Sequence, residues 1–417
     1  MGCTKKRRES MYQSRKSIGQ GIACFAFVFF CLFGWKYSFV DLSLLVPGVI
    51  ILFSAGSAKF ERHVLSIAYG LLVLIFYQAI IQISFSGTDA ESLLRLFRCF
   101  LFCLLASLLA GSRCFTADQL VNAIFRVLVV HALIVILAGL FEPVNGFFSE
   151  LSGNDRVRPF RASGLLAGFD LAGFFCLAGA AILAFEIYKP SSRVRFFGYF
   201  FVFGLGAFFT SRLTVAWFFV LAIFFGATIY KSARSVPLRI AYVVFFSGLI
   251  LFVAWNYFLP IIDVTYSLNW IDVSDESVAD ITARHAQQQE GNLFWEDMFY
   301  LPESWEGLIF GRGQDVPNSD VGYIKDIFRY GLVGVFYSLL FYSYILRMSL
   351  VRAKKYFEPG YSRYLWLIFF FTVLMSLKNN YFYTRGAFSL LILFLCIFYM
   401  IDARLLQGSD GKRIRAA

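Results

Sequence analysis

The residues best suited to chemistry in this chain are arginines that lie beside apolar segments. Arg156, Arg158 and Arg161 share one short polar stretch, and Arg212 lies in the tight turn FFTSRLTV. Guanidinium groups stay charged at physiological pH and can bind a phosphate through two parallel hydrogen bonds. These arginines therefore predict a binding site for a diphosphate group. The alternative is that they snorkel or form ion pairs with the acidic stretch 259–323.

The composition indicates that these arginines belong to a membrane protein. Hydrophobic residues make up 59% of the 417 positions, charged residues make up 16%, and the mean hydropathy is +0.67. Soluble domains are closer to half apolar and a quarter charged. Long apolar runs such as 64–83 lack the alternation of barrel strands, so they predict helices. The net charge of +11 is spread between the apolar segments, which favours a role in topology over nucleic-acid binding.

The apolar stretches predict an all-α, polytopic integral membrane helix bundle of about twelve transmembrane helices. The expected segments are 18–35, 40–57, 64–84, 93–111, 120–141, 163–187, 196–210, 213–230, 238–258, 324–346, 362–378 and 386–403. The organisation is then a basic tail (1–17), helices one to nine (18–258), a large loop (259–323), helices ten to twelve (324–403) and a second tail (404–417).

The distribution of Lys and Arg predicts the orientation. Placing both tails in the cytoplasm also places there the basic loops near 189–195, 231–239 and 347–363, in agreement with the positive-inside rule. Two of the loops that then lie on the outer side stand out, 142–162 and 259–323. The second holds twelve Asp and Glu against two Arg, a formal charge of −10. Capping-box-like spacing at Ser277 and Asp280 predicts a short helix inside it.

Other site chemistries have little support in the sequence. The eight cysteines show neither a disulfide framework nor metal-ligand spacing, and we expect no metal and no cofactor. No internal repeat is visible, so a transporter built from duplicated halves gains no support. His131, in the middle of an apolar segment, is more typical of an internal hydrogen-bond partner than of a proton relay.

Several short motifs follow one another along the chain. They are R-x-S-G-L (Arg161 to Leu165), T-S-R (Thr210 to Arg212), Arg284 in the acidic loop, G-x-G (Gly311, Gly313), N-S-D-x-G-Y (Asn318 to Tyr323) and G-L-x-G (Gly331 to Gly334). In this order, with a long outer loop between segments nine and ten, they resemble the superfamily of O-antigen polymerases and O-antigen ligases. The resemblance covers most of the chain.

The resemblance implies a metal-independent glycosyltransferase of the bacterial inner membrane, acting at the periplasmic face. Its partners would be an undecaprenyl-pyrophosphate-linked oligosaccharide, membrane lipid and a chain-length regulator protein, with no nucleic acid. Arg161, Arg212 and Arg284 would hold the pyrophosphate and stabilise its developing charge. The nearby Arg156, Arg158 and Arg312 are further candidates for that role.

The acceptor hydroxyl must lose a proton, so a base is also expected. His285 and Asp320 are the candidates, with Asp315 behind them, although a histidine beside Arg284 on a solvated helix is often only a surface residue. We expect Asn318, Tyr323 and Arg385 to contact the sugar.

The motifs also bear on the branch of the superfamily. Ligases typically carry a His-Asn pair where this chain reads Pro317-Asn318, and the N-S-D-x-G-Y motif resembles the polymerase branch. Polymerase is therefore the leading hypothesis. The alternatives are an O-antigen ligase, a flippase for the same lipid-linked oligosaccharide, and a non-catalytic scaffold.

Overall fold

The computed structural model describes residues 19–37, 40–54, 59–85, 87, 89–112, 114–152, 161–232, 300–314, 321–376 and 381–408. This part of the chain is helical apart from one small antiparallel ladder, in which β1 (Lys36–Tyr37) pairs with β2 (Val40–Asp41). Two compact units are present. Unit 1 comprises Met1–Leu128, Phe185–Lys189 and Tyr300–Ala417, and unit 2 comprises Val129–Ala184 and Pro190–Phe299.

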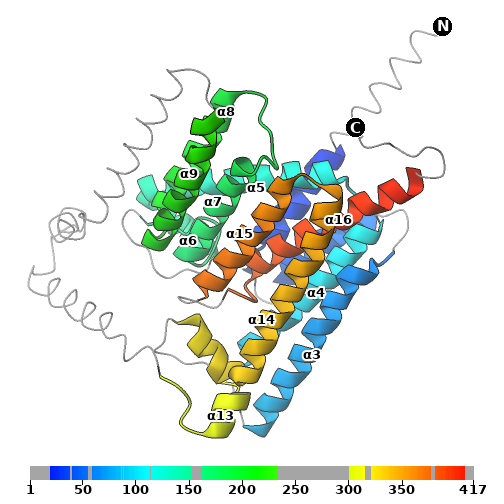
Figure 1. Cartoon of the computed structure of the whole chain (residues 1–417). Coiled ribbons are helices and arrows are strands. Elements are labelled where there is room, and N and C mark those ends of the chain that lie inside the picture. The colour runs from blue at the N-terminus through cyan, green and yellow to red at the C-terminus, as the bar shows by residue number, and fades with distance from the viewer. Residues whose placement is uncertain are drawn as a thin grey trace, which may run out of the picture. The chain divides into compact units, whose positions relative to one another are not determined.

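Unit 1 is built around a hairpin of two long helices and a third long helix beside it. Figure 1 shows α3, α4 and α14 running alongside one another. The elements of this unit are the helix Gly19–Phe33, the β1–β2 ladder, α2 (Leu42–Ser54), α3 (Arg62–Ser84), α4 (Ala90–Ser112), the start of α5 (Ala117–Leu140), α13 (Trp305–Phe310), α14 (Gly322–Tyr356), α15 (Pro359–Met375) and α16 (Arg385–Gly408).

Helix α3 shows how the sequence makes a helix with a packed side and a lipid side. It begins after Glu61, whose carboxylate accepts hydrogen bonds from the backbone amides of His63 (2.6 Å) and Val64 (3.0 Å). This is the contact that a good N-cap makes. Residues spaced by three or four positions are buried on one side, whereas Phe76 is 60% exposed on the other. Such an apolar outer face has a ready partner in lipid.

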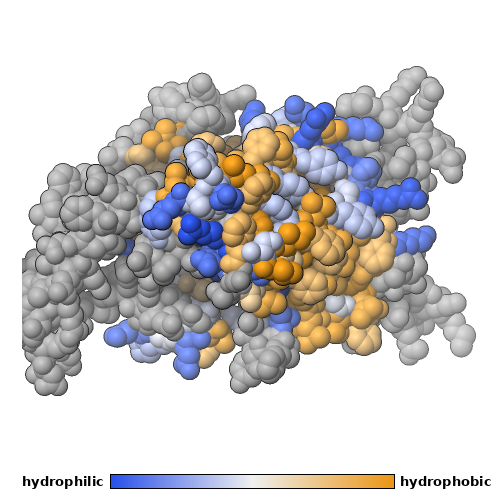
Figure 2. Space-filling view, turned by 90° about the horizontal axis from the view of Figure 1, so that it is seen from below, coloured by the Kyte–Doolittle hydropathy of each residue, from blue (hydrophilic) through white to orange (hydrophobic). Residues whose placement is uncertain are grey.

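The exposed apolar surface continues along α14, where Phe336 is 64% and Leu340 is 54% exposed. Figure 2, which looks at the molecule from the α13 end, shows broad apolar areas beside polar ones. By length and composition, four helices of the described chain can cross a membrane: α3, α4, α5 and Gly322–Lys355 of α14. The protein is therefore a helical membrane protein.

Unit 2 has a helix buried on all sides at its centre. Its elements are the end of α5, α6 (Glu142–Ser152), α7 (Phe169–Ala184), α8 (Arg193–Phe208) and α9 (Arg212–Ser232). Residues Ala172 to Ala184 of α7 are all buried. Gly173 and Gly179 leave no room for a methyl group, because one would meet Thr214 and the other Phe203. Small residues that let helices approach closely are typical of membrane interiors.

Helix α14 is broken near its beginning. Gly331 has φ 67° and ψ −179°, so the first two turns form an arm that is separate from the longer straight part. A side chain is strained at such a φ, and glycine is not. We call residues 322–330 the arm of α14.

The helices can be compared with the predicted segments. Every predicted segment coincides with a described helix, except 238–258, which lies outside the described residues. Among the described residues, four helices meet the length and composition needed to span a bilayer, so the count of about twelve stays a prediction. The large loop contains one described helix, α13, and the expected helix near 277–290 lies outside the described part.

One predicted loop is partly helical. The stretch 142–162 begins with α6, which carries Pro143 in its first turn, a position where proline fits a helix. Asn145 and Ser149 face inward on this helix, and Asn145 Nδ2 donates to the backbone oxygen of Arg161 at 2.9 Å. Because the buried side of α6 carries polar residues, its sequence lacks the apolar pattern from which a helix would be predicted.

Candidate functional site

In unit 2 the R-x-S-G-L segment lies against the turn that contains T-S-R. The backbone amide of Ala162 donates to the backbone oxygen of Phe209 at 2.7 Å, and Asn145 holds the carbonyl of Arg161 from the other side. Arg212 is the first residue of α9, three positions after Phe209. The structure thus brings the backbones of two predicted site residues, Arg161 and Arg212, to one end of this unit.

The turn before α9 is held by buried hydroxyl groups. Thr210 donates to the backbone oxygen of Ala207 at 2.6 Å. Ser211 Oγ accepts from the backbone amide of Thr214 at 3.3 Å and lies 2.9 Å from the Thr214 hydroxyl. Ser211 is therefore the N-cap of α9. The backbone amides of the first turn of a helix favour an anion, so this end of α9 has the polarity that a phosphate requires.

Gly164 explains why the R-x-S-G-L segment contains a glycine. Its φ is +56°, and an added Cβ would lie 2.7 Å from Cγ2 of Val135 and 3.2 Å from Cε1 of His131. His131 is fully buried, with Nε2 3.3 Å from the backbone oxygen of Ala172. Its contacts are those of an internal hydrogen-bond partner, as the sequence predicts.

In unit 1 the G-x-G and G-L-x-G motifs form one backbone contact. Gly311, Gly313 and Gly331 all have positive φ. A Cβ on Gly311 would lie 2.6 Å from the Gly331 backbone nitrogen, and one on Gly87 would lie 2.6 Å from the Gly313 oxygen. The amide of Arg312 donates to the Phe328 oxygen at 2.7 Å. These glycines allow the end of the loop, the arm of α14 and the α3–α4 turn to approach closely.

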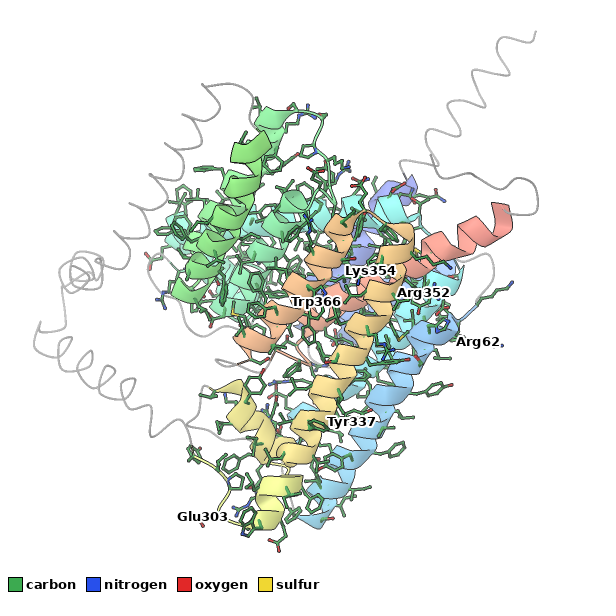
Figure 3. All side chains as sticks on the ribbon, in the orientation of Figure 1. Arg62, Glu303, Tyr337, Arg352, Lys354 and Trp366 are labelled. Atoms are coloured by element: carbon green, nitrogen blue, oxygen red, sulfur yellow. The ribbon has the colours of Figure 1, made fainter. Side chains whose placement is uncertain are left out.

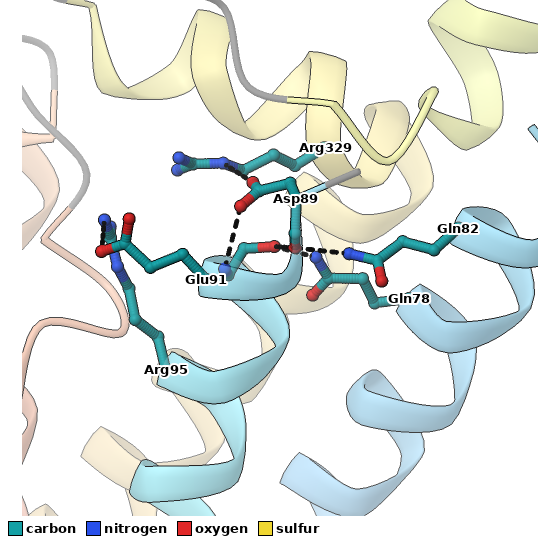
Figure 4. Close-up of polar contacts among 7 residues, drawn as sticks. Gln78, Gln82, Asp89, Glu91, Arg95 and Arg329 are labelled. Carbon is teal, nitrogen blue, oxygen red and sulfur yellow. Dashed lines mark hydrogen bonds and ion pairs between the residues drawn. The ribbon is translucent and has the colours of Figure 1, made fainter. Parts of the chain in front are cut away.

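Beside these glycines lies a buried ion pair. Arg329 Nε donates to Asp89 Oδ2 at 2.7 Å, and the two side chains are only 3% and 6% exposed. Figure 4 shows the pair at the beginning of α4, where Gln82 Nε2 donates to the Asp89 backbone oxygen. A buried ionisable residue in a membrane protein is expensive and is commonly functional.

Asp89 is fixed by further contacts. Its Oδ1 accepts from the Ser92 amide at 3.0 Å, its backbone oxygen accepts from the Ser92 hydroxyl at 3.0 Å, and its own amide donates to Gly313. Gln78 donates in turn to the Ser92 hydroxyl. The arm of α14 carries a second buried carboxylate, Asp326, which is 2% exposed.

The remaining predicted site residues fall into three groups. Arg312 and Tyr323 belong to unit 1: Arg312 is half-buried, with Nη2 3.4 Å from Ser304 Oγ, and Tyr323 donates to the backbone oxygen of Val373 at 2.8 Å. Arg385 is the first residue of α16. The others lie outside the described residues: Arg156, Arg158, Arg284, His285, Asp315, Asn318 and Asp320.

Arg95 and Arg98, which also lie in an apolar segment, have acidic partners. Arg95 Nη2 lies 2.9 Å from Glu91 Oε1 one turn earlier, and Arg98 Nε lies 3.2 Å from Asp41 Oδ2. These two arginines are therefore ion-paired, with partners outside the acidic loop 259–323. The partners come from α4 and β2.

Sequence reasoning missed the Asp89–Arg329 pair and the amides around it. A signal was present, because Gln78 and Gln82 lie one turn apart inside an otherwise apolar segment and so share a face. Arg329 lies five residues inside the predicted segment 324–346, where a charge needs a partner. No rule of sequence spacing links position 89 with position 329, so the pairing itself required the fold.

Metal binding has no cluster to support it in the described part, where no three His, Cys, Asp or Glu side chains gather. No protein-family model matches the chain, and no curated protein matches its sequence. The likeness to O-antigen polymerases and ligases therefore rests on the motifs alone.

Proposed function

We propose that this protein is a polymerase of surface-polysaccharide repeat units. It would transfer a glycan from undecaprenyl pyrophosphate to another lipid-linked repeat at the periplasmic face of the bacterial inner membrane. One observation carries the proposal. The two arginine motifs of unit 2, far apart in the sequence, lie side by side at the capped start of α9, joined by the Ala162–Phe209 hydrogen bond.

The proposed chemistry needs a cationic site for the leaving group. The acceptor hydroxyl attacks the anomeric carbon, the bond from that carbon to the pyrophosphate oxygen breaks, and the lipid pyrophosphate leaves with the electron pair. Arg161, Arg212 and the backbone amides of α9 would stabilise the charge that develops on it. The base that takes the hydroxyl proton is sought in His285 and Asp320, outside the described residues.

The arrangement of charge within each unit supports a site on the outer side. In unit 1, Arg62, Arg352 and Lys354 lie toward one end, and Glu303 lies at the other (Figure 3). In unit 2, α8 begins with Arg193 and Arg195, and its far end leads into the turn before Arg212. By the positive-inside rule the basic ends are cytoplasmic. The glycine contact in unit 1 and the arginine motifs in unit 2 then both face outward.

The test is polymerisation by the purified chain in lipid vesicles, supplied with a lipid-pyrophosphate-linked oligosaccharide and followed as a ladder on a gel. Replacing Arg161 or Arg212 by Lys or Ala should reduce the rate about 100-fold or more, as the loss of one charge-stabilising donor does in other enzymes. The control is Arg195→Ala, at the opposite end of α8, which should leave the ladder unchanged.

The rival functions give different results in the same vesicles. A ligase would move the glycan to a different acceptor without lengthening it. A flippase would carry the lipid-linked oligosaccharide across the bilayer. A normal ladder from the Arg161→Ala and Arg212→Ala chains would overturn the proposed role of this site.

A further inference from the structure

The arm of α14 and the α3–α4 turn are held together by charge. We propose that Asp89 and Arg329 are positioning residues for glycan transfer: together they form a latch that fixes the arm of α14 and the Gly311–Gly313 segment against the α3–α4 turn. The effect on transfer rests on the proposed function. The effect on the arm does not.

The first step of the argument is the geometry of Asp89. One carboxylate oxygen accepts from the Ser92 amide at the start of α4, and the other accepts from Arg329 Nε on the arm. The backbone on each side of the carboxylate is also held, because the Asp89 amide donates to Gly313 and its oxygen accepts from Gln82. Asp89 thus joins the α3–α4 turn to the arm of α14 through its side chain and to Gly313 through its backbone, and both of these partners are far from it in the sequence.

The second step is the break at Gly331. A continuous helix would carry the direction of its straight part into its first turns, but a residue with φ 67° and ψ −179° interrupts it. The direction of the arm therefore depends on contacts at its sides. Those contacts include the Asp89–Arg329 pair and the bond from the Arg312 amide to Phe328. The Tyr77 hydroxyl donates to the oxygens of Phe310 and Tyr330, and the Tyr323 hydroxyl donates to the oxygen of Val373.

The third step is the cost of the pair. Two charges removed from water lose much of their solvation, and well-packed apolar residues are often at least as stabilising at such a position. What an ion pair adds is direction, because the guanidinium and the carboxylate must meet in a defined geometry. The arm begins with Gly322 and Tyr323, the last two residues of the N-S-D-x-G-Y motif. A latch at Arg329 would therefore orient the described end of that motif.

The experiment uses the purified full chain in lipid nanodiscs. The variants are Asp89→Asn, Arg329→Gln and the double variant, with Glu91→Gln as control. Asparagine is as good an N-cap as aspartate, so Asp89→Asn removes the charge and keeps the cap. Glu91 lies in the same turn of α4 and pairs with Arg95 on the surface, where its side chain is 72% exposed. Hydrogen–deuterium exchange then reports on the amides of 309–314 and 322–330.

We expect both single variants to exchange faster over these two segments and the control to match the wild type. The exchange rate of the double variant should lie between those of the single variants and the wild type, because both charges of the Asp89–Arg329 pair are removed together. Unchanged exchange in Asp89→Asn would overturn the latch. If Arg329→Gln fails to fold, Asp89→Asn and the double variant still decide the question.

The second readout is polymerisation. We expect Asp89→Asn to lower kcat about 10- to 100-fold with a smaller change in KM, as misplaced rather than missing substrate contacts do. Faster exchange with wild-type kcat would mean that the pair holds the arm without positioning it for transfer, which would overturn the proposal. A wild-type chain that makes no polymer would overturn the proposed function, and exchange would still test the latch.

Discussion

The two glycines of the segment 161–168 differ in their backbone conformation and in the space around them. Gly164 has a positive φ and no room for a Cβ, whereas Gly168 does not have a positive φ and a Cβ added there would meet no atom within 4 Å. We expect Gly164→Ala to lower the free energy of unfolding by about 1–3 kcal/mol, from strain and the contact with Val135. Gly168→Ala should change it far less. Thermal unfolding in detergent measures both, and equal effects would contradict the assigned conformation.

A surface ion pair in unit 1 gives a prediction of pH dependence. Lys189 Nζ lies 3.0 Å from Glu358, whose hydrogen bond and charge raise the pKa of this lysine above its ordinary value of 10.5. A raised pKa in the folded state means that the pair stabilises the fold below about pH 10.5 and loses this effect as the pH rises further.

Because both side chains are largely exposed, we expect the effect to be small and to vanish at high salt. Lys189→Gln should therefore melt slightly lower than the wild type at neutral pH and low salt, with Lys354→Gln as the control. The difference should shrink as the pH rises above 10.5 and the lysine loses its proton. If the difference in melting temperature between the wild type and Lys189→Gln grew above pH 10.5, the pair would not stabilise the fold in the predicted pH range.

At the scale of elements, α3 supports the break in α14 through one hydroxyl. Tyr77 donates to the backbone oxygen of Phe310 at 3.1 Å and of Tyr330 at 3.0 Å. Tyr77→Phe leaves these carbonyls without that donor, which should lower the free energy of unfolding by about 0.5–1.5 kcal/mol, because the two hydrogen bonds are at most partly buried. Tyr69→Phe, on the exposed side of the same helix, is the matched control. Equal melting temperatures for the two variants would show that the hydroxyl does not support the break.

The elements also show how far sequence reasoning reaches. The lengths of the apolar runs located the helices well, because the thickness of a bilayer sets the length of a spanning helix, and helices of soluble proteins have no such constraint. It missed α6, whose packed side carries Asn145 and Ser149. Motif order indicated that Arg161 and Arg212 belong together, and their segments do meet. The pairing of Asp89 with Arg329 could not be predicted, since neither lies in a motif and the contact depends on how three helices pack.

At the scale of the whole molecule, the prediction concerns orientation in the membrane. Arg62 at the start of α3, and Arg352 and Lys354 at the end of α14, lie at one end of unit 1, away from α13 (Figure 3). A cysteine introduced at the α13 end and one introduced at the basic end should therefore differ in whether a reagent outside the membrane can reach them. We expect Glu303→Cys to react with a membrane-impermeant maleimide in intact spheroplasts, and Lys354→Cys to react only after permeabilisation.

The native cysteines offer little background in this assay, because all those in the described residues are buried. Cys3 lies outside that part, and a Cys3→Ser chain removes it. Labelling of Lys354→Cys in intact spheroplasts would reverse the assigned orientation and place the α13 end in the cytoplasm.

The break at Gly331 also sets the length of the straight part of α14. The straight part of α14, from Leu332 to Lys354, is about 33 Å long at the rise of an α-helix, close to the ~30 Å hydrocarbon thickness of a bilayer. Lys354 at one end and the Asp89–Arg329 pair just past the other would then lie at opposite headgroup levels. Lipids with longer acyl chains would draw the charged pair into hydrocarbon, so the acyl-chain length of the host membrane becomes a variable to which this protein should be sensitive.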